Sequence, residues 1–315
     1  METVSAAVER GIGFLAAEQL ADGEFPSFER EGSKDAPGTP GSSPFVTTFA
    51  LYALSLTGAE AATTIVERGA AFLMDVQEAP GLWRYWTKRS HRKIDPDLDD
   101  TCCASWVLRW LGTPGLELAN EAAILANRAP SGLFRTWVRP PDAPNDLDSV
   151  VNANVLLYLG ERAETAQARE ILVQSINRGM EESTYYYYLD PIALYYMVSR
   201  AYVHGARGLE RCREAVLRKT LARQGGDGGW GDALLTGLAL CTLCNYGLAQ
   251  SPEVARGTRQ LAATQHPDGG WGDHLFYAGP LPPAPHSYWY SSPALTAAVC
   301  IEALCKARLG EQTHS

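Results

Sequence analysis

The chain alternates between two kinds of segment, most of them twelve or more residues long, which favours helices over strands. Segments of the first kind carry charged residues and have an amphipathic pattern: about 2–18, 61–76, 116–127, 161–182, 207–223 and 252–264. Segments of the second kind are nearly uncharged: about 44–57, 98–112, 148–160, 189–203, 232–249 and 291–305. Helices that are apolar all round are buried, whereas helices with one polar stripe lie at the surface. The pattern therefore predicts six outer and six inner helices in alternation.

A short motif recurs where an outer segment gives way to an inner one. A glutamine is followed by a glycine four residues later and by an aromatic residue six residues later, at Gln19, Gln77, Gln224 and Gln265. A fifth, degenerate copy has Arg128, Gly132 and Phe134. Repeats of one helical pair every 45–50 residues or so indicate one closed assembly. We expect an all-α fold, a single (α/α)6 barrel formed by residues 1–315 as one domain, with the inner helices parallel.

Composition narrows the classes of function. The 315 residues are 46% apolar and 20% charged, which is ordinary for a soluble globular protein. A net charge of -9 without a basic patch argues against a nucleic-acid partner. No segment has the length and apolarity of a membrane span, and the first residues lack the features of a signal peptide. Seven cysteines without framework spacing indicate reduced thiols, so we expect a cytoplasmic location.

The most unusual segment is DPDLDDTCC, residues 95–103, which precedes an apolar helix. One interpretation is capping, since aspartates suit a helix N-terminus. A calcium loop is disfavoured because its sixth and twelfth positions hold Asp100 and Trp106 instead of Gly and Glu. The other interpretation is a proton donor: crowded, desolvated carboxyls cannot all ionise, so at least one keeps a proton. Such a proton is available to a substrate that is not basic, such as an alkene or an epoxide.

These motifs together resemble those of class II terpene cyclases. Residues 97–101, DLDDT, match the DxDD(T) signature of that family, and the glutamine repeats match the QW motifs of squalene-hopene cyclases and their relatives. The resemblance covers essentially the whole chain and is nearest to the single-domain cyclases that build meroterpenoids from prenylated aromatic acids. It implies a cyclase in which Asp99 donates the proton and Asp97 and Asp100 hold and tune it. No cofactor is expected, with Mg²⁺ required only for a diphosphate substrate.

Carbocation chemistry requires a dry cavity with aromatic faces, which stabilise cations without reacting with them. Candidate substrate contacts are the aromatic residues Tyr187, Tyr195, Trp106, Tyr288, Trp289 and Tyr290, and the polar residues Asp148, Asn152 and His286. The tryptophans of the repeats, Trp83, Trp230 and Trp271, are instead expected to brace the barrel. The expected partner is a small hydrophobic isoprenoid, whose apolarity would bring the protein into transient contact with a membrane surface.

Two alternatives stay open. Protein prenyltransferase β subunits have the same type of fold and repeats and bind zinc through Asp, Cys and His, a set that Asp100, Cys102 and His286 could imitate. A barrel that binds isoprenoids without catalysis is the other alternative. Zinc content separates the first from a cyclase, and loss of function on Asp99→Asn separates the second.

Overall fold

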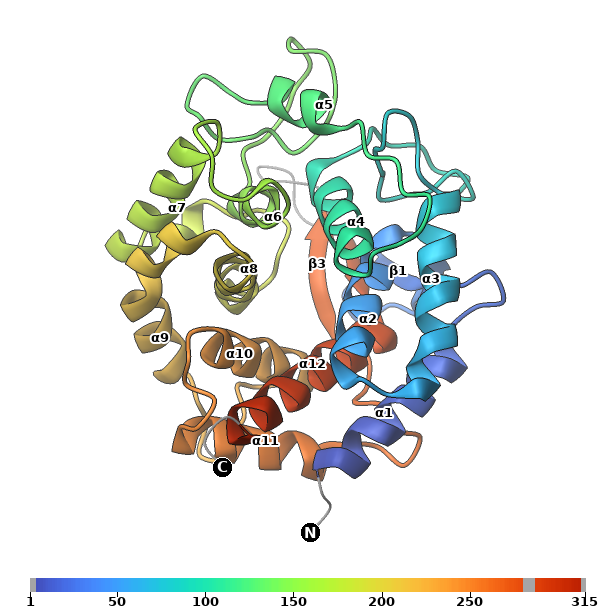
Figure 1. Cartoon of the computed structure of the whole chain (residues 1–315), viewed down its shortest axis with the longest axis vertical. Helices are drawn as coiled ribbons and strands as arrows, with labels where there is room; N and C mark the ends of the chain where they lie inside the picture. Colours follow the sequence, from blue (N-terminus) through green and yellow to red (C-terminus); the bar gives the residue numbers. More distant parts are fainter. Residues whose placement is uncertain (1–3, 280–286, 313–315) are drawn as a thin grey trace.

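The computed structural model describes residues 4–279 and 287–312, and there the helices form two concentric rings (Figure 1). The inner ring contains α2 (Pro44–Thr57), α4 (Leu98–Trp110), α6 (Ser149–Leu159), α8 (Pro191–Val203), α10 (Ala233–Asn245) and α12 (Pro293–Gln312). The outer ring contains α1 (Val4–Glu18), α3 (Thr63–Asp75), α5 (Glu121–Ala126), α7 (Ala166–Arg178), α9 (Arg213–Leu221) and α11 (Pro252–Thr264). Each inner helix contacts the next, and α12 contacts α2, so the ring closes. The predicted helical barrel is confirmed.

Burial follows the charge pattern of the sequence. In α6 the ten residues from Ser149 to Tyr158 are all buried, as expected for a helix with neighbours on every side. In α11 the buried residues are Val254, Gly257, Thr258, Leu261 and Ala262, which form one stripe at helical spacing. Within the described residues no helix combines the length and apolarity that crossing a bilayer requires.

Short polar side chains begin five of the inner helices. The side chains of Ser43, Asp97, Asp148, Asp190 and Asp232 each accept a hydrogen bond from a backbone N–H in the first turn of the helix that follows. This satisfies donors that the first turn would otherwise leave unpaired. Capping therefore accounts for four of the aspartates that the sequence places before inner helices, Asp97 among them.

The glutamine motif joins neighbouring outer helices. The Gln265 amide donates to the carbonyl of Gly269 in its own turn (2.8 Å) and to Ala7 in α1 (2.9 Å). Gln19 and Gln224 make the same pair of bonds within their turns and to α3 and α11. The indole N–H of Trp271 donates to the carbonyl of Leu261, ten residues back, and Trp83 and Trp230 repeat this bond. The tryptophans of the motif thus brace the barrel.

A second bond ties each of four turns to its inner helix. The backbone N–H of Trp83 donates to Thr101 Oγ1 (3.0 Å), and that of Trp230 donates to Thr236 Oγ1 (2.9 Å). Phe25 and Phe134 do the same with Thr47 and Asn152. Each acceptor is the fourth residue of its helix. Thr101, the threonine of the DLDDT segment, therefore occupies the position at which each of these four repeats anchors its turn to the inner helix.

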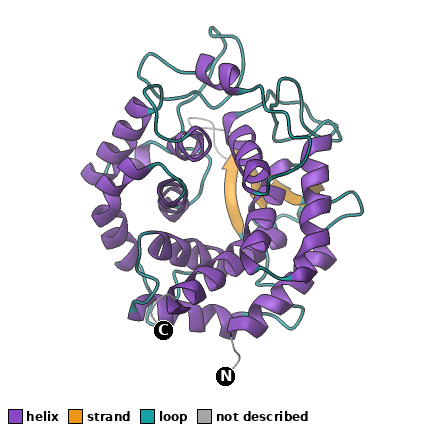
Figure 2. Ribbon diagram, viewed as in Figure 1, coloured by secondary structure: helices purple, strands orange, loops and turns teal. Residues whose placement is uncertain are grey.

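A small antiparallel sheet, which the helical pattern did not predict, joins the two ends of the chain (Figure 2). Its strands are β1 (Ser27–Glu31), β2 (Thr39–Gly41), β3 (Leu275–Gly279) and β4 (Tyr288–Ser291), in the order β2-β1-β4-β3. In the central pair, β1 and β4, Glu29 lies opposite Tyr290. The strands have three to five residues, too few for a clear period, and their partners are distant in sequence.

Candidate active site

A cavity of about 420 Å³ opens at the end of the barrel where the inner helices begin. Its walls come from the start of α2, α4 and α6, from the loops before α4, α6 and α8, and from β3 and β4. The lining is mainly aromatic and acidic: Phe45, Tyr85, Trp86, Ile94, Asp97, Asp99, Asp100, Thr136, Trp137, Arg139, Val151, Tyr187, Tyr188, Tyr277, Ala278, Gly279, Tyr288 and Tyr290.

The three aspartates of the DLDD segment have different surroundings. Asp97 is the N-cap of α4 and accepts from the backbone N–H of Asp100 at 2.8 Å. Both side chains are buried, and Asp97 Oδ2 and Asp100 Oδ1 have no hydrogen-bond partner among the described residues. Asp99 is partly exposed, and it lines the cavity. The capping interpretation and the proton-donor geometry thus apply to different members of one motif.

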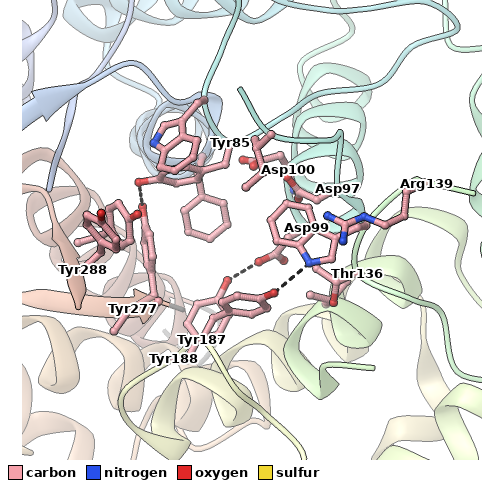
Figure 3. A pocket seen from close by; sticks show the side chains of 18 residues that line it. Tyr85, Asp97, Asp99, Asp100, Thr136, Arg139, Tyr187, Tyr188, Tyr277 and Tyr288 are labelled. Atoms are coloured by element: carbon pink, nitrogen blue, oxygen red, sulfur yellow. Dashed lines mark hydrogen bonds between the residues drawn. The ribbon is translucent and has the colours of Figure 1, made fainter. Parts of the chain in front are cut away.

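Two neutral donors hold the Asp99 carboxyl, and Figure 3 shows the one from Tyr188. The Tyr188 hydroxyl donates to Oδ2 at 2.6 Å, and the Asn154 amide donates to Oδ1 at 2.6 Å. Tyr188 precedes α8, and Asn154 lies in the buried α6, so both partners come from well-packed parts of the barrel. Donors in fixed positions stabilise a carboxylate more than the neutral acid.

Burial is the main electrostatic influence on this group. It raises the pKa of Asp97 to about 7, and together with the charges of Asp97 and Asp99 it raises the pKa of Asp100 well above its ordinary value. Burial also raises the pKa of Asp99, while the hydrogen bonds from Tyr188 and Asn154 and the charge of Arg200 oppose the shift. Crowded carboxyls in a low dielectric retain protons near neutral pH. The site can therefore store a proton next to an apolar cavity.

The wall away from Asp99 is built from phenol rings (Figure 3). The hydroxyls of Tyr85 and Tyr277 are hydrogen-bonded at 2.8 Å, and Tyr85 also bonds Ser27 at 3.0 Å. The ring of Tyr290 stacks on Tyr277 with centroids 5.1 Å apart and contacts the Tyr85 ring edge-on at 5.3 Å. Such faces attract a cation by about 0.5–2 kcal/mol each.

Three of the predicted substrate contacts, Tyr187, Tyr288 and Tyr290, line the cavity. The Tyr187 hydroxyl donates to Asp146 at 2.9 Å, and that of Tyr288 donates to Glu31 at 3.1 Å. His286 lies outside the described residues.

The other five predicted contacts require correction, because their side chains are engaged elsewhere. Trp106 packs between Tyr52, Trp110, His204 and Arg200 inside the barrel, and the Tyr195 hydroxyl donates to Glu181. Asp148 caps α6, and Asn152 bonds the backbone of Phe134. Trp289 lies between two cavity residues of β4, and successive side chains of a strand point to opposite faces.

Several lining residues were not predicted from the sequence. Tyr85, Trp86 and Trp137 belong to loops, and Tyr277 belongs to a strand of the sheet. Tyr188 stands in the run YYYY at 185–188, of which only Tyr187 is among the candidates named above. Asn154, a partner of Asp99, had a usable signal: it is one of two asparagines in a largely apolar helix, and buried polar groups need partners.

The residues proposed to imitate a zinc site are only partly described. Asp100 and Cys102 are both buried at the start of α4, and His286 lies outside the described ranges. Between residues 4 and 279 and between 287 and 312, no group of three or more His, Cys, Asp or Glu side chains is arranged to hold a metal ion.

Comparison with solved structures finds the same fold at low sequence identity. A protein from Actinoplanes is 21% identical with a TM-score of 0.73, and the match covers 97% of this chain and 100% of that one. The type II terpene cyclase MstE from Scytonema is 18% identical with a TM-score of 0.75, over 98% and 99% of the two chains. The ent-copalyl diphosphate synthase from Streptomyces platensis is 16% identical with a TM-score of 0.64, over 87% of this chain and 52% of that one.

Neither models of protein families nor curated protein sequences match this chain. The structural likeness extends over nearly the whole length of MstE and over about half of the larger synthase. At these identities, structural likeness establishes the architecture, and function must be argued from the site. The chain has the fold of class II terpene cyclases.

Proposed function

We propose that this chain is a class II isoprenoid cyclase in which Asp99 is the general acid. The observation that carries the proposal is the Asp99 carboxyl, which faces an aromatic cavity while Tyr188 and Asn154 hold its two oxygens. An acid in this position can transfer its proton to an apolar substrate bound in the cavity. The fold shared with type II terpene cyclases supports the same assignment.

The first step is transfer of the Asp99 proton to a terminal alkene or an epoxide of the substrate. An alkene's π electrons form the new C–H bond, and the O–H electron pair stays on Asp99 as a carboxylate. Tyr188 and Asn154 already donate to both oxygens, so the new charge is stabilised without rearrangement. The buried Asp97–Asp100 pair retains a proton nearby, which limits the negative charge around Asp99.

The second step is ring closure, in which each internal alkene attacks the neighbouring cationic carbon. The cavity assists by holding the chain folded, since reacting atoms in near-attack positions avoid most of the entropic cost. The rings of Phe45, Tyr277 and Tyr290 line the wall and offer π faces to the moving charge. Exclusion of water prevents early quenching.

For the substrate, we propose a linear polyprenyl chain attached to an aromatic acid. MstE has been solved in complex with its substrate, geranylgeranyl dihydroxybenzoate, and with its product, merosterolic acid A. In this chain Arg139 lines the cavity, stacks on Trp137 at 5.2 Å and pairs with Asp95 at 2.9 Å. A guanidinium beside an indole suits a carboxylate on an aromatic ring. The apolar chain supports transient contact with a membrane surface.

No metal or cofactor has a role in this chemistry, so the proposed enzyme works without either. A diphosphate substrate would change that expectation, since Mg²⁺ commonly accompanies phosphate groups. The zinc-dependent prenyltransferase and the non-catalytic binding barrel are the competing proposals, and one experiment separates all three.

The test is product analysis by chromatography and mass spectrometry. Purified protein, with and without EDTA, is incubated with farnesylated and geranylgeranylated hydroxybenzoic acids and with the free diphosphates. A cyclase gives a product of unchanged mass and new retention time from a prenylated acid, whether or not EDTA is present. Activity that EDTA abolishes and zinc restores would favour a prenyltransferase, and binding without conversion would favour a carrier.

A further inference from the structure

The tyrosine side chains that line the cavity have different neighbours. The Tyr188 hydroxyl donates to the proposed acid Asp99. The hydroxyls of Tyr85 and Tyr277 bond each other, and that of Tyr85 also bonds Ser27. Tyr290 lies directly opposite Glu29 in the β1–β4 pair, so its phenol and the Glu29 carboxylate are cross-strand neighbours. Opposed residues of antiparallel strands project from the same face of the sheet.

Tyr290 lines the cavity, whereas Glu29 is not among the lining residues. The Tyr290 side chain is 9% exposed, and the Glu29 side chain is 13% exposed. Arg92 clamps Glu29 through two contacts, of 2.7 and 2.9 Å, and stacks on the rings of Trp86 and Tyr288. Such a bidentate clamp fixes the orientation of the Glu29 carboxylate.

Proton-initiated cyclisation must also end with the loss of a proton. Resting on the cyclase function proposed above, we infer that Tyr290 and Glu29 form the relay that removes the terminal proton. A C–H bond next to the cationic carbon breaks, and its electron pair forms the product alkene. The proton passes to the Tyr290 oxygen while the original Tyr290 proton passes to the Glu29 carboxylate.

The protons of the whole reaction balance with water as the only other reactant. Glu29 returns its proton to solvent at the mouth, Asp99 regains one proton, and the product is an isomer of the substrate. Placing the base on the wall away from Asp99 suits this assignment. A base beside the acid would take up the proton that starts the reaction before the rings had closed. Stacking of Tyr290 on Tyr277 also places the acceptor oxygen within the ring cluster that attracts the cation.

The test compares Tyr290→Phe and Glu29→Gln with wild type on the prenylated hydroxybenzoic acid that wild type cyclises. The readout is the mixture of products formed per substrate consumed, which does not depend on the overall rate. The share of the wild-type product falls at least about fivefold, replaced by alkene isomers or by products one water heavier. Tyr290→Phe leaves the Glu29–Arg92 pair intact, so it tests the relay even if Glu29→Gln folds poorly.

Glu31→Gln is the matched control. Glu31 is on the same strand, also lies near Arg92 (3.9 Å), and bonds Tyr288 at the mouth, but its side chain is 68% exposed. We expect it to keep the wild-type products. Wild-type product ratios in both relay variants, or a shift caused by Glu31→Gln alone, would overturn the relay while leaving the cyclase function intact. Absence of cyclisation by wild type itself would overturn both.

Discussion

Three adjacent carboxyls of one motif perform different tasks because their backbone positions differ. Asp97 precedes the first turn of α4 and caps it, whereas Asp99, two residues later, reaches the cavity. The backbone N–H of Asp100 donates to Asp97, and both side chains are buried. Capping by Asp97 is an ordinary structural role, and the proposed proton donation depends on the crowding of all three carboxyls.

Removing the Tyr188 hydroxyl should weaken the acid more than it disturbs substrate binding. Tyr188→Phe deletes a 2.6 Å donor to the carboxylate that forms on proton transfer. We expect kcat to fall about 10²-fold with KM changed less than about threefold. Steady-state kinetics measures both constants.

Tyr158→Phe is the control for losing a buried hydroxyl. The Tyr158 hydroxyl bonds Asn120 at 2.8 Å, and this residue is not part of the cavity lining. Its kcat should stay near the wild-type value. Equal losses in the two variants would mean that Tyr188 only supports the fold.

The buried carboxyls should make stability depend on pH in a defined direction. Burial raises the pKa of Asp148 to about 7 from its ordinary 3.8, so the folded state binds the proton more tightly than the unfolded state. The contribution of Asp148 is therefore fully present below about pH 4 and is lost as pH rises to 7, by at most about 1.4 kcal/mol per unit.

The variant Asp148→Asn isolates this effect, since asparagine caps helices as well as aspartate does and does not titrate. Denaturant unfolding of both proteins across pH 4–7 should show the wild type losing stability relative to the variant as pH rises. The comparison is needed because His204, whose pKa burial lowers to about 3, acts with the opposite sign. A wild type that gains stability relative to the variant as pH rises would contradict the assignment.

The residues that sequence could and could not identify differ in how local their signals are. Asp99 was identified because its neighbours in sequence form a motif. Tyr85 and Tyr277 were not, because their hydroxyls meet only after residues far apart in sequence are folded together. Trp106 was among the candidate substrate contacts, yet the Arg200 guanidinium and three aromatic rings surround it inside the barrel.

At the scale of elements, one repeat unit organises both the barrel and the site. The turns at Trp83 and Trp230 are each fastened to an outer helix by the tryptophan indole and to an inner helix by the bond to Thr101 or Thr236. The bond from Trp83 to Thr101 sets the start of α4 against the turn before it, and so helps to place the aspartates.

Thr101→Val tests this link, with Thr236→Val as its equivalent in another repeat. Each change leaves the buried backbone N–H of a tryptophan without its acceptor. This should lower the free energy of unfolding by about 1–3 kcal/mol in both variants. Denaturant unfolding measures this loss. Only Thr101→Val should also lower kcat, because α10 contributes no residue to the cavity lining. A similar loss of kcat in both variants would show that stability alone is involved.

Elements were predicted as far as their periodicity was long enough to detect. The helices at 44–57 and 252–264 begin and end where the pattern places them. The predicted segment 116–127 contains the six-residue α5, where the glutamine motif is degenerate. The strands escaped detection because pairing between β1 and β4 depends on contacts across some 260 residues.

At the scale of the whole molecule, closure of the ring creates the site. Parallel inner helices place their N-termini at one end, where dipoles and caps collect polar groups. The sheet joins the first and last repeats and supplies one wall of the cavity. The central claim is that this end of the barrel delivers a proton from Asp99 to a bound isoprenoid.

The most direct test is Asp99→Asn, which keeps the shape of the side chain and removes its acid. Binding of a geranylgeranylated hydroxybenzoic acid is measured by calorimetry, and conversion by mass spectrometry, for the variant and the wild type in parallel. The account predicts affinity within about threefold of wild type and cyclisation reduced at least about 10³-fold. Retention of cyclisation by the variant, or activity that depends on zinc instead of Asp99, would contradict it.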